Sequence, residues 1–422
     1  MVSNYPIIGI DVAKHFCFYA AVSPLGKPFL KPFKAFNTKQ GLLFALDQIK
    51  KVENAFGIKP LISLESTGHY SARIVHFFLK QGFEVFLINP LVSHSIKNSA
   101  VRKVKTDPVD ALELAKLLLL HDFHPTHLNS DALTNLKLLG RTRFQLASQR
   151  ITLLNQLVAA VEQLAPLFTT VFNPGSLTAL SLLTQFPFPS QWLDQNNHTV
   201  ILSLLESLPR RGKAYSKNKF TALLACAEDA LVSGMNYSAH GTVVQVYAKT
   251  LCVLDKQIAT LDDEIKSVAA QLPELSLLKT IPGIGDTLAS IILGEIGDIT
   301  RFNNSKQLVA FCGVDPSVKQ SGNFIGSKNK ISKRGSPFLR RALYLAATTA
   351  IRKDTKGRLV NPVIYEYYHE KVLYKPKKLA LGAVMNKLVR IIYSVLKNMQ
   401  SFHLISSAEQ VELHLNTRKK AA

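Results

Sequence analysis

Short β-branched apolar runs fill the first ninety residues and alternate with helix-like segments in the later part of that region, and this pattern most constrains the fold. The spacing predicts helices over 39–52 and 71–80. Strands are predicted at five short runs: 6–12 (PIIGIDV), 16–22 (FCFYAAV), 31–36, 60–64 (PLISL) and 84–88 (EVFLI). Strands that alternate with helices predict an α/β domain with parallel strands. Sites in such sheets lie at the carboxyl ends of the strands.

Four acids fall where such a site would form. Asp11 ends the first predicted strand, and Glu65 directly follows the fourth. Asp107 and Asp110 lie three residues apart at the start of a predicted helix, with Pro108 in its first turn. Residues three apart share one face of a helix, so both carboxylates can reach one point.

Each acid also has a simpler interpretation. Asp107 suits a helix N-cap, and Asp110 suits the positive end of the helix dipole. Asp11 could cap a turn, and Glu65 could lie in an exposed loop. Four acids gathered together would repel unless a divalent cation bound them, and oxygen ligands favour Mg²⁺ or Mn²⁺. Three cations that could hold phosphate lie just upstream: Arg102, Lys103 and Lys105.

Composition points to a polyanionic partner. The 422 residues are 47% hydrophobic and 19% charged, which is typical of a globular chain, and the net charge is +22. Such a surplus favours DNA or RNA without distinguishing them. The four cysteines have neither zinc-ligand nor disulfide spacing, so we expect a reducing cytoplasm. We expect no signal peptide, and no membrane span, because no run of about 18 uncharged apolar residues occurs.

The middle of the chain has two long helical seams, over 136–164 and 244–268. Their alternating steps of three and four are typical of coiled coils. They could pair within one chain, pair between chains, or belong to a globular bundle. Residues 171–236 between them predict an inserted helical subdomain, with a basic loop at 209–219 (PRRGKAYSKNK).

The sequence LLKTIPGIGDTLASIILGEIG predicts two helices joined by a hairpin. Gly283 and Gly285 in that hairpin would let its backbone approach a phosphate without reading base sequence. The alternative is a tight helix–helix turn inside a bundle.

Residues 316–341 are basic and contain no acid after Asp315. Ser321, Ser327, Ser332 and Ser336 of this segment are interspersed with glycines. With no histidine or obvious base adjacent in sequence, chemistry alone favours phosphate donors over nucleophiles. The cations of this segment are Lys319, Lys328, Lys330, Lys333, Arg334, Arg340 and Arg341.

Together these pieces resemble the DEDD transposases of the insertion-sequence 110 family, relatives of the Piv invertases. The resemblance rests on seven motifs: GIDVAK (9–14), LESTGHY (64–70), KTDPVDA (105–111), IPGIG (281–285), GDITRFNNSKQLVAFCGVDP (297–316), QSGNFIG (320–326) and ISKRGSPFLRRAL (331–343). It implies a RuvC-like, RNase H-like N-terminal domain, a long helical coiled-coil middle, and an all-α C-terminal transposase domain with a helix-hairpin-helix. The expected domains are residues 1–125, 126–275 with the insert at 171–236, 276–400, and a polar tail at 401–422.

The resemblance also implies roles. Asp11, Glu65, Asp107 and Asp110 would bind Mg²⁺ or Mn²⁺, and Ser321 would be the covalent nucleophile, with Ser336 and Ser332 as alternatives. Residues expected to contact nucleic acid are Arg102, Lys103, Lys105, Gly283, Gly285, Lys319, Lys328, Lys330, Lys333, Arg334, Arg340 and Arg341.

The implied function is RNA-guided DNA transposition in a bacterial or archaeal cytoplasm, acting at the nucleoid. A structured non-coding RNA would pair with donor and target DNA, and the protein would act as a homodimer or homotetramer. One alternative is a metal-dependent nuclease, such as a Holliday-junction resolvase, in which water replaces the serine. Another is a non-catalytic protein that binds RNA or DNA.

Overall fold

The chain folds into two compact units, Met1–Leu128 and Asn129–Ala422, in the computed structural model. The structure describes residues 4–66, 68–88, 90, 106–121, 123, 125–126, 129–207, 212–316 and 330–404, and the backbone of 320–321 and 324–325.

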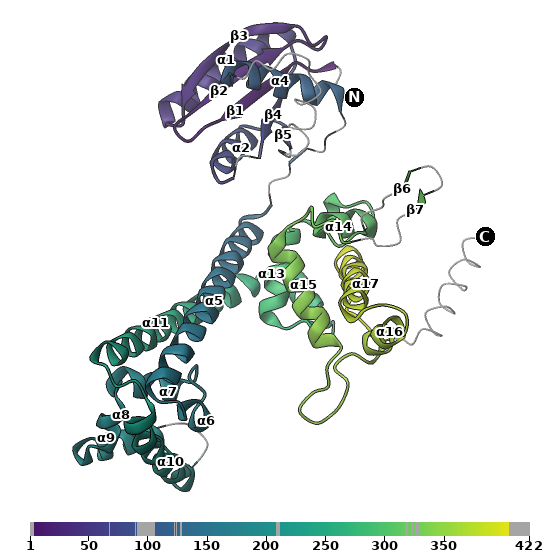
Figure 1. Ribbon diagram of the computed structural model, residues 1–422. Coiled ribbons are helices and arrows are strands. Elements are labelled where there is room, and N and C mark those ends of the chain that lie inside the picture. Colours follow the sequence, from purple (N-terminus) through teal and green to yellow (C-terminus); the bar gives the residue numbers. More distant parts are fainter. Residues whose placement is uncertain are drawn as a thin grey trace. The chain divides into compact units, whose positions relative to one another are not determined.

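A five-stranded mixed sheet forms the centre of the N-terminal unit, in the order β3-β2-β1-β4-β5 (Figure 1). β1, β2 and β3 are antiparallel neighbours, whereas β4 and β5 run parallel to β1. The strands are β1 (Ile7–Val12), β2 (Phe16–Val22), β3 (Pro28–Phe36), β4 (Leu61–Glu65) and β5 (Val85–Ile88). All five predicted strands are present, and β3 is longer than expected.

Helices cover both faces of this sheet. One face buries Ile8, Ile10 and Ile62 beneath α1 (Lys39–Phe56) and α2 (Tyr70–Lys80). On the opposite face, α4 (Asp107–Leu120) packs its residues Ala115 and Leu118 against β1, β2 and β4. Successive side chains of a strand point to opposite faces, so β1 contributes alternate residues to each core.

Two long antiparallel helices organise the second unit: α5 (Asp131–Leu164) and α11 (Ser238–Ala269). Arg143 of α5 pairs with Asp262 of α11, and Arg150, two turns further on, pairs with Asp255. The partner number falls by seven as the first rises by seven, as an antiparallel pair requires. The two predicted seams therefore pair with each other within one chain.

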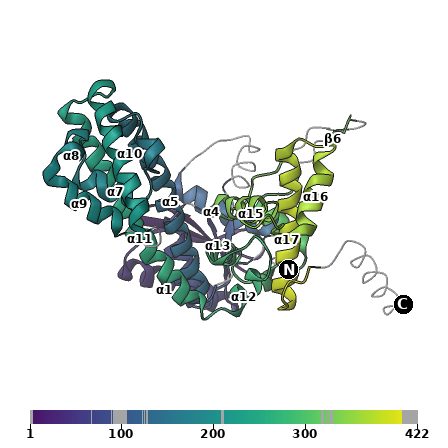
Figure 2. The same cartoon turned by 90° about the horizontal axis from the view of Figure 1, so that it is seen from below.

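The segment between them forms a helical lobe, drawn with α5 and α11 in Figure 2. Its core packs around Trp192 and Phe168, which are fully buried, together with Leu157 and Leu251 from the long helices. Its helices are α6 (Phe168–Val171), α7 (Leu177–Gln185), α8 (Pro189–Leu193), α9 (Gln195–Glu206) and α10 (Gly212–Ser233). The predicted loop at 209–219 is wrong from Gly212 onward, because α10 begins there. The buried residues of α10, including Ser216, pack against the lobe, and this packing stabilises a helix although the segment is polar in composition.

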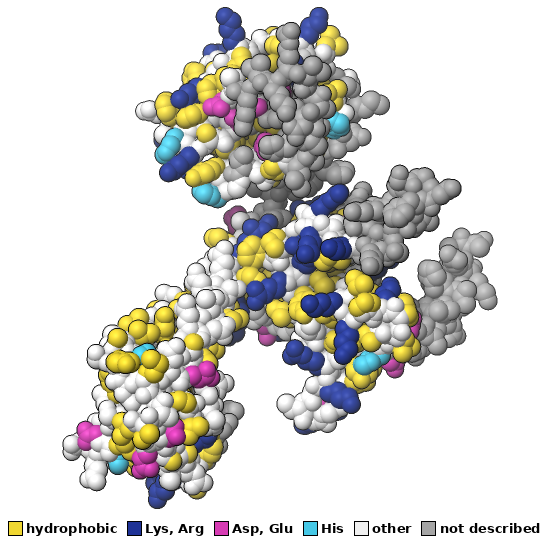
Figure 3. All heavy atoms as spheres, in the orientation of Figure 1, with side chains coloured by type: hydrophobic (Ala, Val, Ile, Leu, Met, Phe, Trp, Pro, Cys, Tyr) yellow, Lys and Arg dark blue, Asp and Glu magenta, His cyan; other side chains and the backbone are white. Residues whose placement is uncertain are grey.

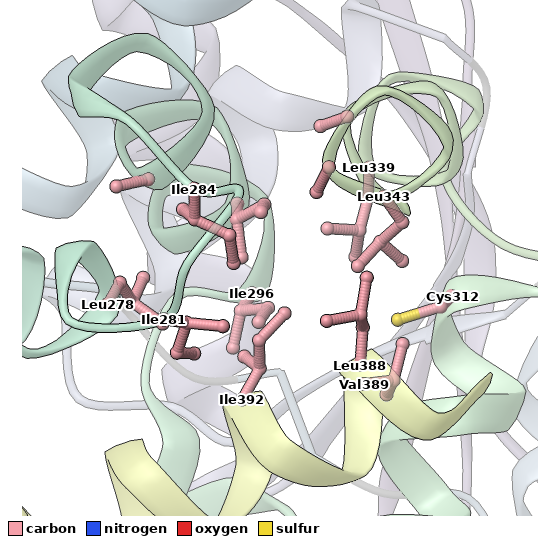
Figure 4. Packing of buried hydrophobic residues seen from close by; sticks show 14 of the residues in the cluster. Leu278, Ile281, Ile284, Ile296, Cys312, Leu339, Leu343, Leu388, Val389 and Ile392 are labelled. Carbon is pink, nitrogen blue, oxygen red and sulfur yellow. The ribbon is translucent and has the colours of Figure 1, made fainter. Parts of the chain in front are cut away.

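The C-terminal part is a helical bundle around one apolar core. Leu278, Ile281 and Ile296 point toward Leu343 and Leu388 (Figure 4). The helices are α12 (Pro273–Lys279), α13 (Asp286–Ile296), α14 (Ser305–Cys312), α15 (Pro337–Ala350), α16 (Pro362–Val372) and α17 (Lys377–Asn398), with a 3₁₀ turn at Ile299–Arg301. The predicted α/β N-terminal part and helical remainder are confirmed.

One helix of the described chain, α17, is long and apolar enough to cross a membrane by length and composition. Half of that apolar stretch is buried inside the unit, and Val384, Leu388 and Ile392 belong to the bundle core. Its apolar character is explained by its place at the centre of the bundle.

Candidate active site

Asp11 and Glu65 lie next to each other at the carboxyl ends of neighbouring parallel strands. The register pairs Gly9 with Ser63 and Ile10 with Leu64, so each acid is the residue directly after a paired one. By the alternation of a strand, Asp11 lies on the same face as Gly9, and Glu65 on the same face as Ser63. This is the face that α4 covers.

The backbone of α4 lies directly on that face. A Cβ on Gly9 would lie 2.7 Å from the amide nitrogen of Ala115 and closer still to the carbonyl oxygen of Ala111. The hydroxyl of Ser63 donates a hydrogen bond of 2.9 Å to the carbonyl of Leu114. Only glycine at position 9 permits this approach of helix to strand.

The direction of α4 brings its first turn toward Asp11. Along β1, Ile7 clusters with Ala115 and Leu118 of α4, and Gly9 meets Ala111 and Ala115. Two strand residues advance about 6.6 Å and one helical turn about 5.4 Å, so the turn before Ala111 lies along the β1 position two residues beyond Gly9. Asp107 and Asp110 belong to that turn. All four acids therefore lie along the same edge of the same sheet face.

The environments of these acids differ. Asp11, Glu65 and Asp110 are half-buried, and Asp107 is exposed. Burial raises the pKa of the neighbouring Cys17 thiol to about 12, and the negative charge of Asp11 contributes to the rise. Cys17 also donates a 3.1 Å hydrogen bond to Asn37, so its proton is held in place.

Asp107 is not the N-cap. Thr106 occupies that position in extended conformation, and Asp107 is the first helical residue. The N-cap assignment of Asp107 was wrong by one residue, and Asp110 takes part in the first turn through its backbone N–H, which donates to Thr106. Both acids still lie at the positive end of the helix dipole.

The donor chemistry fits a hard divalent cation, because all four groups are carboxylates. Within the residues that the structure describes, however, no three acidic, histidine or cysteine side chains lie close enough together to hold one ion. The acids are aligned along one edge without converging. Arg102, Lys103 and Lys105, which precede α4, lie outside the described residues.

The glycine hairpin forms the turn between α12 and α13. Gly283 has a φ of 105°, and a Cβ there would lie 3.0 Å from that of Ala350 at the end of α15. Gly285 faces open space, and Asn361 donates a hydrogen bond of 3.3 Å to the carbonyl of Pro282. The neighbour that requires glycine at 283 is thus α15, while Gly285 leaves room for a ligand.

Ser321 lies on a small hairpin. Its backbone belongs to β6 (Gln320–Ser321), which pairs antiparallel with β7 (Phe324–Ile325). A bridge between Pro316 and Ile331 joins the chain before and after this hairpin, and the hairpin together with the bridge is called the arm. The side chain of Ser321, and Lys319 and Lys328, lie outside what the structure describes.

The two alternative serines have partners in the structure. Ser332 donates its hydroxyl to the carboxylate of Asp315, and its backbone N–H donates to the Asp315 carbonyl at 2.8 Å. Ser336 is the N-cap of α15 and accepts from Leu339 at 3.3 Å. Sequence reasoning missed Asp315 as a base beside Ser332, because the two residues lie 17 positions apart in the chain. The bridge between Pro316 and Ile331 brings them together.

Basic side chains gather over α15 and its neighbours (Figure 3). Arg341 stacks on Phe144 at 4.3 Å and donates to Ser148 of α5 at 3.3 Å. Arg340 donates to the carbonyl of Gly335 at 3.3 Å, which ties it to the end of the arm. The other described cations of this segment are Lys330, Lys333 and Arg334, all exposed.

A buried ion pair beneath this surface was not predicted. Glu295 of α13 has a side chain only 2% exposed, and Arg141 of α5 binds both of its oxygens. Burial alone would raise the pKa of Glu295, but the hydrogen bonds and charge of Arg141 hold it below its usual value. Nothing in the sequence pairs these two residues, which lie 154 positions apart in the chain.

Comparison with known proteins agrees with these features. Residues 8–166 match the IS110 DEDD family, described as a transposase, and residues 275–369 match the family described as "Transposase IS116/IS110/IS902 family". The chain is 21% identical to an uncharacterized 44.8 kDa protein of insertion element IS116 from Streptomyces clavuligerus, over 94% of this chain and 95% of that protein. It is 23% identical to the pilin gene-inverting protein of Moraxella bovis, over 94% of this chain and 97% of that protein. A 30% identity to the transposase for insertion sequence element IS1111A of Coxiella burnetii covers 35% of this chain and 40% of that protein.

The two family matches cover the two parts of the chain in which the sites are predicted. The first match contains all four acids, and the second contains the glycine hairpin and Ser321. The chain belongs to the IS110 family of transposases, and it is a DNA transposase or recombinase.

Proposed function

We propose that this transposase cuts and exchanges DNA strands through a serine–phosphate intermediate, using a divalent metal held by Asp11, Glu65, Asp107 and Asp110. The observation that supports this most directly is the contact of α4 with Gly9. That contact aligns the first turn of α4 with the carboxyl ends of β1 and β4, where the other two acids lie.

The N-terminal unit is, in this proposal, RuvC-like. Three antiparallel strands followed by two parallel ones, in the order β3-β2-β1-β4-β5, support that assignment. So do the helices on both faces of the sheet. The proposed domains continue with the helical middle and its lobe, and with a C-terminal transposase domain whose α12–α13 hairpin would contact the backbone of DNA.

The four carboxylates would hold Mg²⁺ or Mn²⁺, for which oxygen ligands are suited. When bound, the ion would neutralise charge that builds on the scissile phosphate. Four acids along one edge would otherwise repel one another.

Ser321 is the proposed nucleophile. Its Oγ would form a bond to phosphorus while the bond from phosphorus to one sugar oxygen breaks, and the serine proton would pass to that oxygen. The reverse reaction, with a hydroxyl of another strand, would rejoin DNA without ATP, because the ester bond is conserved. The arm places Ser321 on a hairpin whose base is tied by Asp315 and Ser332.

Sequence recognition is proposed to be delegated to a structured non-coding RNA that pairs with donor and target DNA. A basic chain, with a net charge of +22, can then bind through phosphates alone. We further propose that acids and serine act together from different protomers of a homodimer or homotetramer, in the cytoplasm of a bacterial or archaeal cell.

The test is strand cleavage of nicked or suicide DNA, resolved on denaturing gels. Asp107→Asn and Asp110→Asn should each abolish cleavage and leave DNA binding intact. Asp131→Asn is the matched control, because Asp131 holds the same first-helical position after the N-cap Ser130 in α5. Loss of folding in the Asp107 and Asp110 variants, with cleavage intact in whatever remains folded, would contradict the proposal.

The nucleophile is tested by a serine series. Ser321→Ala should abolish the covalent protein–DNA adduct, whereas Ser332→Ala and Ser336→Ala should retain it. Normal cleavage by Ser321→Ala would instead favour a resolvase in which water attacks.

A further inference from the structure

The turn between α16 and α17 carries an unusual group of aromatic and basic side chains. Leu373 is 85% exposed and Tyr374 is 59% exposed, in a chain that buries most of its large apolar groups. Between Tyr365 and Lys387 the sequence has five lysines and two glutamates. Figures 1 and 2 both show α16 and α17 side by side, so the two helices present these residues together.

Lysines surround the rings of this turn. The Nζ atom of Lys371 lies 5.3 Å from the centre of the Tyr374 ring, and that of Lys375 lies 5.5 Å away. Lys387 of α17 and Lys371 both approach the ring of Tyr367, at 4.4 and 5.0 Å. Tyr367 packs against the bundle core and so fixes where the two lysines lie.

Tyr374 is exposed and has two lysines beside its ring. The hydrogen bond from Lys371 to Glu370 is the main cause that raises the pKa of Lys371, and its interaction with Tyr374 adds to the rise. Lys371 pairs with Glu370 at 2.9 Å. An exposed aromatic ring that is oriented by neighbours loses little conformational entropy when a ligand stacks on it.

The combination is suited to one kind of ligand. Unpaired nucleotides bind proteins by stacking bases on aromatic rings while cations follow the phosphates. Duplex DNA keeps its bases stacked internally and cannot use the ring. We propose that the Tyr374 platform, which comprises Tyr374, Lys371, Lys375 and Lys387, binds an unpaired nucleic-acid strand by stacking a base on Tyr374. This inference depends only on the chain acting on nucleic acid, and not on the proposed metal or serine chemistry.

The test uses full-length protein and fluorescein-labelled oligo-dT, oligo-U and duplex DNA, with binding followed by anisotropy at fixed salt. Tyr374→Ala should weaken binding of the single strands about tenfold and leave duplex binding unchanged. Tyr374→Phe should bind as the unchanged protein does, because the ring remains. The tighter of oligo-dT and oligo-U identifies whether DNA or RNA is the occupant.

Two controls sharpen the result. Tyr237→Ala removes another exposed tyrosine, 66% exposed before α11, and should change nothing. Tyr374→Leu keeps an apolar side chain without a ring, so it should behave like Tyr374→Ala. Lys375→Gln should weaken binding of single strands and reduce the slope of log affinity against log salt by about one.

Single-strand binding that survives both Tyr374→Ala and Tyr374→Leu would overturn the platform. The platform would also be overturned if flotation with phosphatidylserine vesicles depended on Tyr374 and oligonucleotide binding did not. That result would show that the turn binds a membrane surface. Asp11→Asn separates the two proposals. The Asp11→Asn variant should lose strand cleavage but keep single-strand binding. If instead Tyr374→Ala leaves single-strand binding unchanged, the platform proposal fails, and the proposed role of the acids in cleavage is unaffected.

Discussion

The contact between β1 and α4 can be tested by a single methyl group. Gly9→Ala would place a Cβ 2.7 Å from the amide nitrogen of Ala115, where ordinary contacts begin at about 3.5 Å. The helix would have to move by more than about 0.8 Å, because the Ala111 carbonyl oxygen would lie closer still, and overpacking of this kind typically costs about 1–3 kcal/mol. Because α4 carries Asp107 and Asp110, the displacement should also lower strand-cleavage activity, by about 100-fold for a shift near 1 Å.

Gly41→Ala is the matched control for this substitution. A Cβ at residue 41 would lie 2.8 Å from the amide nitrogen of Phe36, so the overlap is similar and lies in the same unit. It would disturb the junction of β3 and α1, however, and not α4. Both variants should melt at lower temperature by calorimetry, while only Gly9→Ala should lose cleavage well below its melting temperature. Equal activity of the two variants, or an unchanged melting temperature for Gly9→Ala, would refute the placement of α4.

Three other outcomes are expected. Glu295→Gln should lower the free energy of unfolding by about 2 kcal/mol at neutral pH, because Arg141 loses a charged partner. Since the pKa of Glu295 is lower in the folded chain than in the unfolded one, this stabilisation is present above the unfolded pKa and is lost as the pH falls through the folded pKa; melting curves of both proteins should therefore converge in acid. Removal of divalent cations with EDTA should abolish strand cleavage and leave DNA binding measurable by gel shift, and cleavage that persists would contradict the role of the acids. Ser332→Ala should cost about 1 kcal/mol, seen in urea denaturation, by removing the hydrogen bond to Asp315; a protein that lost its covalent adduct with DNA would instead identify Ser332 as the nucleophile.

Local patterns predicted the N-terminal unit well. Strands such as PIIGIDV are short, β-branched and bounded by turns, and α1 and α2 have clear apolar spacing. The alternation of strands and helices in the later part of this unit predicted parallel strands, but not that β1 pairs with β4. The rule that sites lie at the carboxyl ends of parallel strands predicted that Asp11 and Glu65 would lie close together.

Long-range geometry was the part that the sequence could not supply. The antiparallel pairing of α5 with α11 was one of several possibilities until Arg143 and Arg150 were seen to face aspartates. The helix at Gly212 was hidden by a polar, basic composition, since burial of a few residues such as Ser216 decided its conformation. The pairs Ser332–Asp315 and Arg141–Glu295 depend on tertiary contacts that leave no periodic signal.

The continuity of α5 has a mechanical consequence. Its first half lies against α13 and α15 through Arg141 and Phe144, and its second half enters the lobe core at Leu157 and Leu164. A helix of 34 residues extends about 51 Å, and its ion pairs with α11 brace it along the way. Because α5 is one continuous helix, a tilt of its lobe end would also move its other end. A ligand that binds the lobe would therefore shift the helices α13 and α15, which carry the basic surface.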